Sequence, residues 1–168
     1  GINQPNRNRL LWRDSTVDGL KTGYTSAAGY CLVASAKKDG QRLISVVLGA
    51  AGTESRAQES QKLLTYGMRF FETHLLYDAG EVITQARVWG GVEDYVDLKL
   101  EEDLAVTIPR GQAKYIKATI DINTEIEAPL LAGDVLGKLV ITLDEETIIS
   151  RDLIASKDLR EGGFIKGM

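Results

Sequence analysis

The spacing of the apolar residues in this chain changes near residue 80. Before that point they recur at intervals of three and four residues, at Leu64, Met68, Phe71 and Leu75. This interval is typical of an amphipathic helix, and it predicts a helix over about residues 54–76. Asp78-Ala79-Gly80 ends the pattern, so we expect a domain boundary after residue 77.

Beyond the boundary, apolar and polar residues alternate with a period of two. The alternating runs lie at residues 96–100, 104–108, 116–122 and 135–143. Short alternating strands separated by turn residues are typical of a small β-sandwich or barrel. We therefore expect residues 78–168 to form an all-β domain after an α+β part at residues 1–77.

The first part contains a Lys21-Thr22-Gly23 triplet, followed by β-rich runs at residues 31–36 and 42–48. Asp39-Gly40 joins those runs and predicts a tight hairpin. The triplet then lies on or just before a strand, with two further strands folding back beside it. On an edge strand it presents an ammonium, a hydroxyl and a backbone without a side chain, which suit a carboxylate-bearing peptide or a β-lactam.

Arg56 is a second candidate, because it lies in the first turn of the predicted helix. The helix start is marked by a capping-box spacing from Ser55 to Gln58, with Thr53 as a competing cap. A cation there opposes the helix dipole, which favours anions by about 0.3–1 kcal/mol. A cation at this position is explained if an anion lies between the guanidinium and the free backbone N–H groups of the first turn. The alternative is that the side chain simply bends into solvent.

Several segments together resemble the D-alanyl-D-alanine carboxypeptidases, the low-molecular-weight penicillin-binding proteins of bacteria. The resemblance covers about residues 3–164 in the expected order. It is carried by residues 6–12, 17–25, 28–36, 42–49, 59–67, 107–111 and 128–130. It implies an α+β fold in which residues 1–77 are the C-terminal part of a β-lactamase/transpeptidase-like catalytic domain, followed by a small all-β sandwich domain.

The resemblance also implies roles for individual residues. Lys21 would be catalytic, organising the proton network around the family's serines and offering positive charge to the substrate. Thr22 would bind the terminal carboxylate, Gly23 would let the peptide backbone approach, and Arg56 would assist with the carboxylate. Arg7, in Asn6-Arg7-Asn8, matches a second such arginine. We expect Lys21, Thr22, Arg56 and Arg7 to converge on one concave edge.

Tyr24 departs from the family, which often has His directly after the triplet. A tyrosine keeps a planar ring and a polar tip but removes a group that titrates near neutral pH. Arg9 and Arg13 match no functional residue, and we interpret them as surface charge.

In the family, two motifs lie upstream of the triplet: S-x-x-K, which carries the nucleophilic serine, and S-x-N. Only 20 residues precede Lys21 here, and no S-x-N occurs in the sequence. One S-x-x-K string, Ser35 to Lys38, lies at a strand end rather than at a helix start. We therefore interpret it as a solvated lysine pair at a turn. The chain is expected to be the C-terminal portion of a carboxypeptidase whose catalytic serine lies in a missing N-terminal half.

Composition excludes several kinds of partner and site. The net charge of −4 argues against nucleic acid as a partner. One cysteine, Cys31, permits no internal disulfide, and one histidine, His74, cannot build a zinc site. No cofactor motif and no apolar run long enough to span a bilayer occurs. We expect no metal and no cofactor, with Cys31 buried in its strand and His74 packing or capping at the helix end.

The expected partners are a peptidoglycan stem peptide ending in D-Ala-D-Ala, β-lactam antibiotics, and the missing half of the catalytic domain. By the resemblance the protein is periplasmic and held at the inner membrane by an amphipathic anchor helix, which is absent from this chain and would begin where residues 162–168 end. Two alternatives remain at this point. One is a non-catalytic β-domain interaction module; the other is a fragment of a β-lactamase-like enzyme, against which the all-β domain argues.

Overall fold

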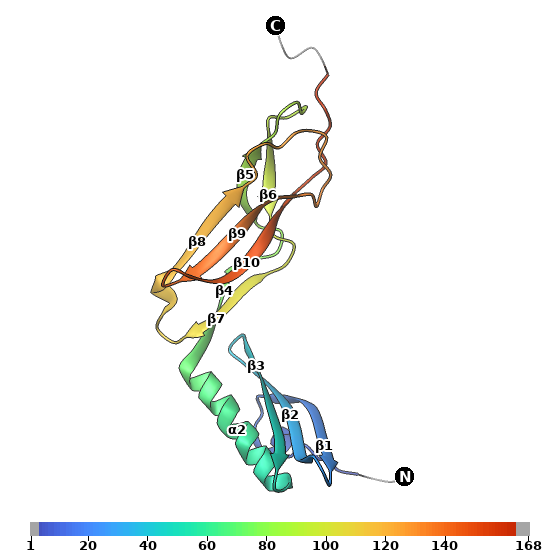
Figure 1. Cartoon of the computed structure of the whole chain (residues 1–168), viewed down its shortest axis with the longest axis vertical. Helices are drawn as coiled ribbons and strands as arrows, with labels where there is room; N and C mark the ends of the chain where they lie inside the picture. The colour runs from blue at the N-terminus through green and yellow to red at the C-terminus, as the bar shows by residue number, and fades with distance from the viewer. Residues whose placement is uncertain (1–3, 164–168) are drawn as a thin grey trace. The chain divides into compact units, whose positions relative to one another are not determined.

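The computed structural model describes residues 4–163. These residues divide into two compact units (Figure 1), one of residues 4–73 and 107–110 and one of residues 74–106 and 111–163. The expected boundary after residue 77 falls C-terminal to this division, and the inclusion of residues 107–110 in the first unit was not expected. Residues 164–168, after which the anchor helix is expected, lie outside the described residues.

The first unit contains a three-stranded antiparallel sheet in the order β1-β2-β3 (Figure 1). Its strands are β1 (Val17–Thr25), β2 (Gly29–Lys38) and β3 (Gln41–Ala50). Asp39 and Gly40, between β2 and β3, have φ angles of 50° and 79°. Two consecutive positive φ values are those of the tight turn that matches strand twist. The predicted hairpin is confirmed.

Helix α2 (Thr53–Phe70) packs along one face of this sheet. Alternate residues of β2, namely Leu32, Ala34 and Ala36, are buried in one cluster with Ala57 and Leu64 of α2 and Leu10 of the short helix α1 (Leu10–Arg13). Because successive side chains of a strand point to opposite faces, this face of the sheet belongs to α2. The other face carries the odd-numbered residues of β2.

The predicted start of this helix is confirmed to within one residue, but its predicted caps and its predicted end are wrong. Gly52 is the N-cap and no side chain caps the helix, so neither Thr53 nor Ser55 has that role. The helix ends at Phe70, and residues Phe71–Tyr77 form strand β4, which carries His74. The four-residue spacing of Phe71 and Leu75 misled the prediction, because four residues is close to one helical turn and also equals two strand periods.

Arg110, forty residues after the end of α2, caps the C-terminal end of that helix with hydrogen bonds. Its Nη2 donates to the carbonyls of Met68 and Phe71 at 3.0 and 3.1 Å, and its Nε donates to that of Arg69 at 3.2 Å. Its backbone N–H donates to the carbonyl of Phe70 at 2.9 Å. The last carbonyls of a helix have no partner within the helix, and a cation there also suits the dipole.

Replacing Arg110 with Ala is therefore expected to lower the stability of the first unit by about 1–3 kcal/mol, the range for hydrogen bonds made by a charged donor. Arg110→Lys keeps the charge but not the forked donors, and it should recover less than half of the loss. Thermal unfolding of the three proteins measures this. Equal melting temperatures for the wild type and Arg110→Ala would show that water satisfies these carbonyls equally well.

The second unit is all-β, as predicted. Its five-stranded antiparallel sheet has the order β5-β6-β10-β9-β8. A separate two-stranded ladder pairs β4 with β7, and both of these strands have residues in each unit. The strands are β5 (Val82–Arg87), β6 (Tyr95–Lys99), β7 (Leu104–Pro109), β8 (Ile116–Ile122), β9 (Val135–Leu143) and β10 (Glu146–Ala155). The four alternating runs of the sequence are β6, β7, β8 and β9, whereas β5 and β10 were not predicted.

The core of the second unit is built from the inward residues of the central strands. Leu98, Leu139, Ile141 and Leu153 are all fully buried. Each such side chain contributes roughly 1.5–3 kcal/mol relative to its exposed state. Asp144 and Glu145, with φ angles of 47° and 72°, form the two-residue turn between β9 and β10.

The first unit has a less complete core than the second. On β3, Ile44, Val46 and Leu48 are 61%, 56% and 72% exposed, on a strand at the edge of its sheet. Long apolar edge strands normally gain a covering partner. Hydrogen exchange of the 168-residue chain should therefore be faster at Ile44 and Leu48 than at Leu139 and Ile141. Equally slow exchange in both units would contradict this.

Candidate functional site

The Lys-Thr-Gly triplet lies on β1, at one edge of the three-stranded sheet. On its inner side Lys21 lies opposite Val33, Thr22 opposite Leu32 and Gly23 opposite Cys31. Among the described residues no strand pairs with the outer side of β1. An edge strand presents unpaired N–H and C=O groups that can pair with an extended peptide.

Lys21 and Thr22 leave this strand on opposite faces. Thr22, opposite Leu32, lies on the face covered by α2, whereas Lys21, opposite Val33, lies on the other face and is exposed. The Lys21 ammonium donates to the carbonyl of Thr22 at 2.7 Å. The expected convergence of all four side chains on one edge is therefore wrong for Lys21, because adjacent strand residues cannot share a face.

Gly23 is not required by the fold itself. A Cβ built on Gly23 would lie 3.7 Å from the Cβ of Cys31, which is an ordinary van der Waals contact. Its φ is not in the left-handed region that favours glycine. An alanine would therefore fit at this position in the described chain. Cys31 itself is half-buried, less than expected for a core cysteine.

Arg56 reaches from α2 to the strand that carries the triplet. Its Nη1 donates to the carbonyls of Gly23 at 3.0 Å and Cys31 at 3.3 Å, and its Nη2 to that of Arg7 at 3.5 Å. Arg56 is only 4% exposed. Its partners in the described part of the chain are neutral carbonyl oxygens, so its positive charge is held beside Gly23 without a carboxylate to neutralise it.

Two tyrosines extend this contact along the sheet. The Arg56 guanidinium lies 5.6 Å from the centre of the Tyr30 ring, within the range of a cation–π interaction. Tyr30 lies opposite Tyr24 in the β1–β2 register, and their ring centres are 4.4 Å apart. Sequence reasoning missed Tyr30, since a tyrosine at the start of a β-rich run carries no signal beyond strand propensity.

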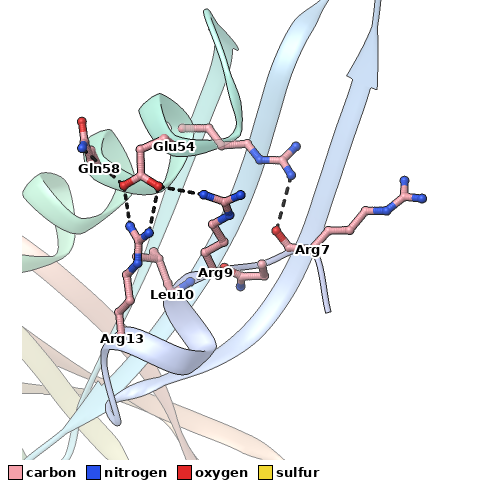
Figure 2. Close-up of polar contacts among 8 residues, drawn as sticks. Arg7, Arg9, Leu10, Arg13, Glu54 and Gln58 are labelled. Atoms are coloured by element: carbon pink, nitrogen blue, oxygen red, sulfur yellow. Dashed lines mark hydrogen bonds and ion pairs between the residues drawn. The ribbon is translucent and has the colours of Figure 1, made fainter. Parts of the chain in front are cut away.

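Arg7 contacts Arg56 through its backbone carbonyl. Its carbonyl accepts the bond from Arg56, while its own guanidinium is exposed and points away from the other labelled residues (Figure 2). The neighbouring Asn8 is 2% exposed and donates to the carbonyl of Gly19 on β1 at 3.1 Å. Asn8, which sequence reasoning missed, thereby fixes the segment that carries Arg7.

Arg9 and Arg13 are exposed, as interpreted from sequence, and both also form ion pairs. Both contact Glu54 in the first turn of α2, Arg13 with distances of 2.6 and 2.8 Å and Arg9 with 3.0 Å (Figure 2). The bonds from Arg13 and Arg9 lower the pKa of Glu54 from its ordinary 4.5 to about 2. The three side chains are about half exposed, and they attach α1 to the start of α2.

A depressed carboxyl pKa has a defined effect on acid stability. The contribution of Glu54 is complete above its unfolded pKa and is lost as the pH falls from about 4.5 towards 2. The melting temperature of the first unit should fall over this window, and in Glu54→Gln the fall should be smaller. Thermal unfolding at intervals from pH 6 to pH 2 tests it. Parallel curves for the two proteins would contradict the assignment.

The S-x-x-K string from Ser35 to Lys38 does not form a nucleophile site. Ser35 lies within β2, is 2% exposed, and its hydroxyl accepts a hydrogen bond from Arg42. Lys38 ends the strand and is exposed. Three residues apart on a strand, the two side chains point to opposite faces and cannot share a proton.

No group of His, Cys, Asp and Glu in the described residues is arranged to hold a metal ion. None of the helices formed by residues 4–163 is long and apolar enough to cross a membrane.

Comparison with known proteins agrees with the resemblance seen in the sequence. Residues 71–161 match the family model for the C-terminal domain of penicillin-binding protein 5, and residues 1–52 match that for D-alanyl-D-alanine carboxypeptidase. The chain is 48% identical over 165 residues to D-alanyl-D-alanine carboxypeptidase DacC of Escherichia coli, and 45% identical over 166 residues to DacA of the same bacterium.

These matches cover most of this chain but a minor part of the relatives. They include 97% and 98% of the chain and 41% of each E. coli protein. The crystal structure of penicillin binding protein 5 from Haemophilus influenzae is 44% identical, with a TM-score of 0.88 over 95% of this chain and 47% of that one. The match of residues 71–161 excludes a β-lactamase fragment. The chain belongs to the D-alanyl-D-alanine carboxypeptidase family of penicillin-binding protein 5.

Proposed function

We propose that this chain carries one wall of the active site of a serine-type D-alanyl-D-alanine carboxypeptidase. The enzyme removes the terminal D-Ala from peptidoglycan stem pentapeptides and is acylated by penicillins. The observation that carries the proposal is the outer edge of β1, where the Lys21-Thr22-Gly23 backbone is unpaired and the charge of Arg56 is held beside Gly23.

The chemistry of this edge suits an extended peptide that ends in a carboxylate. The backbone of β1 pairs with the peptide, and Gly23 leaves room for its close approach. Thr22 lies on the Arg56 face and offers a hydroxyl to the terminal carboxylate. The positive charge of Arg56 makes this end of the strand favourable for an anion, since carbonyl partners do not cancel the charge. Arg7, with an exposed guanidinium, is a further carboxylate ligand, and Tyr24 borders the site.

Lys21 acts on the opposite face from Thr22, towards the nucleophile. In this proposal a serine supplied by the rest of the enzyme gives its proton to the network that includes Lys21 and adds to the carbonyl carbon of the D-Ala-D-Ala bond. The terminal D-Ala leaves with a proton delivered through the network that includes Lys21, and water then hydrolyses the acyl-enzyme. A penicillin acylates the same serine.

The exposed apolar residues of β3 are the proposed contact surface for the rest of the enzyme. The chain spans 41% of the length of its E. coli relatives, so the remaining part of such a protein is available to cover Ile44, Val46 and Leu48. We propose that this remainder, which is the missing half of the catalytic domain, docks against the edge and outer face of β3. The all-β unit serves as a spacer or interaction module of a periplasmic enzyme held at the surface of the inner membrane.

A chimera tests the proposal. The part of E. coli DacC that precedes the matched region is joined to residue 1 of this chain, and D-Ala release from a peptide ending in D-Ala-D-Ala is measured. The chimera is expected to release D-Ala, and the DacC part alone is not. A chimera that folds and binds penicillin but acts on no D-Ala-D-Ala peptide would refute the assigned substrate.

A matched pair of variants separates packing from function at Gly23. Gly23→Ala should fold normally, because the added methyl meets only ordinary contacts, but it should obstruct the peptide. Gly40→Ala in the distant hairpin turn adds a methyl where a positive φ makes it strained, and it should affect stability but not substrate binding. The KM and the melting temperature of each chimera distinguish the two effects.

A further inference from the structure

We infer that Tyr30 and Arg56 form a positioning pair that fixes Gly23 and Tyr24 at the outer edge of β1. The inference rests on the proposed function, because it takes that edge to be the substrate edge. Neither residue needs to touch the substrate for this role. Tyr30 matches nothing among the roles implied by the family resemblance.

The first support is the number of separate segments that Arg56 joins. One guanidinium on α2 donates to carbonyls of β1, β2 and the segment before α1. A planar fork of five N–H groups is suited to hold several acceptors in fixed directions, which a lysine cannot do. Because the group is 4% exposed, water does not compete effectively for these contacts.

The second support is the position of the Tyr30 ring. It lies between Arg56, at 5.6 Å, and Tyr24, at 4.4 Å, and the two tyrosines are cross-strand partners on the face of α2. Tyr24 is 59% exposed, so little else restrains it. A tilted ring pair of this kind contributes about 0.5–1.5 kcal/mol beyond its buried area. The ring of Tyr30 therefore connects Arg56 with Tyr24, the residue directly after the triplet, and restrains the position of Tyr24.

The third support is the exposure of this end of β1, which β2 holds on its inner side as far as Thr25, opposite Gly29. The Thr25 hydroxyl also accepts from the Ala28 N–H at 2.9 Å. The strand has a partner on its inner side alone among the described residues, and its last residues, Gly23 to Thr25, are all exposed. Arg56 and Tyr30 act on these residues, whereas Asn8 holds the strand further back, at Gly19.

The test uses the 168-residue chain and two measurements that involve no substrate. Near-ultraviolet circular dichroism reports the Tyr24–Tyr30 pair, and hydrogen exchange reports the backbone of residues 21–25. Arg56→Lys, which removes no tyrosine, should reduce the contribution of this pair to the band of the six tyrosines and make exchange of residues 21–25 about tenfold faster. Tyr30→Leu should have the same two effects, and Tyr30→Phe should preserve slow exchange because it keeps the ring.

Arg110→Lys is the matched control, since Arg110 also donates to several carbonyls but at the other end of α2. It should leave the tyrosine band and residues 21–25 unchanged even if it lowers the melting temperature. Equal acceleration of exchange throughout residues 17–70 in Arg56→Lys, or an unchanged tyrosine band, overturns the inference. If Arg56→Lys does not fold, Tyr30→Leu against Tyr30→Phe decides alone, and equal exchange in those two variants overturns it.

The same variants in the chimera separate this inference from the proposed function. Tyr30→Leu should raise KM for the D-Ala-D-Ala peptide about tenfold with a smaller change in kcat, because a misplaced edge weakens pairing with the peptide before chemistry. An inactive wild-type chimera would refute the proposed function while the substrate-free measurements still decide the positioning role.

Discussion

Replacing Lys21 with Ala in the chimera should lower the rate of penicillin acylation by about 10²–10⁴, the range for loss of a positioned proton-transfer group. The physical reason is that the ammonium both assists proton transfer and supplies positive charge where negative charge develops. Lys21 is exposed on the face away from α2, so its removal should not disturb packing. Stopped-flow acylation with a chromogenic β-lactam measures the rate.

Lys37→Ala is the control for Lys21. Lys37 is exposed on the neighbouring strand β2, on the same face of the sheet but at its other end. It should retain the wild-type acylation rate. An acylation rate within a factor of about three of wild type in Lys21→Ala, well below the range expected for proton-transfer groups, would remove Lys21 from the catalytic machinery.

The 168-residue chain on its own should form no covalent adduct with labelled penicillin. Nucleophilic catalysis by serine needs a base within hydrogen-bond reach of the hydroxyl. Ser35 is buried within β2 with its hydroxyl bonded by Arg42, and Lys38 points to the other face. Ser45 and Ser60 are also buried, at 4% and 0% exposure. Intact-mass analysis after incubation with penicillin measures the adduct.

A stoichiometric adduct mapped to any serine of this chain would contradict that expectation. Heat-denatured chain, incubated in the same way, controls for nonspecific acylation. The chimera serves as the positive control, since its serine from the DacC part should be acylated.

The strands could be predicted from sequence where local chemistry decides the structure. Asp39-Gly40 permits a turn with two positive φ values, and β7 shows buried and exposed residues in strict alternation. In such cases the period of the apolar residues and the chemistry of one turn suffice. Strand β10 was missed because its burial is confined to its last residues, around Leu153 and Ala155, so its sequence does not alternate.

The end of α2 could not be predicted, because the deciding contacts are distant in sequence. Residues 71–75 fit a helical stripe as well as a strand, and the carbonyls of the last turn are satisfied by Arg110. No local pattern near Phe70 shows where such a donor comes from. Distant contacts of this kind override local propensity.

In the site, too, features set by the local sequence could be predicted, whereas contacts between distant segments could not. The sequence pointed to Arg56 through its position against the helix dipole, but its partners are backbone carbonyls of Gly23, Cys31 and Arg7. Backbone acceptors have no residue identity, so no motif can encode them. The separation of Lys21 from Thr22 follows from strand alternation, and it could have been derived from the predicted strand.

Hydrogen exchange of the acylated chimera shows whether the ligand binds along the outer edge of β1. Exchange of backbone amides is compared before and after acylation by penicillin, over residues 21–25 of β1 and residues 41–48 of β3. Pairing with the bound ligand should slow exchange in residues 21–25 and leave residues 41–48 unchanged. Unchanged exchange at residues 21–25 in a fully acylated chimera would contradict the account.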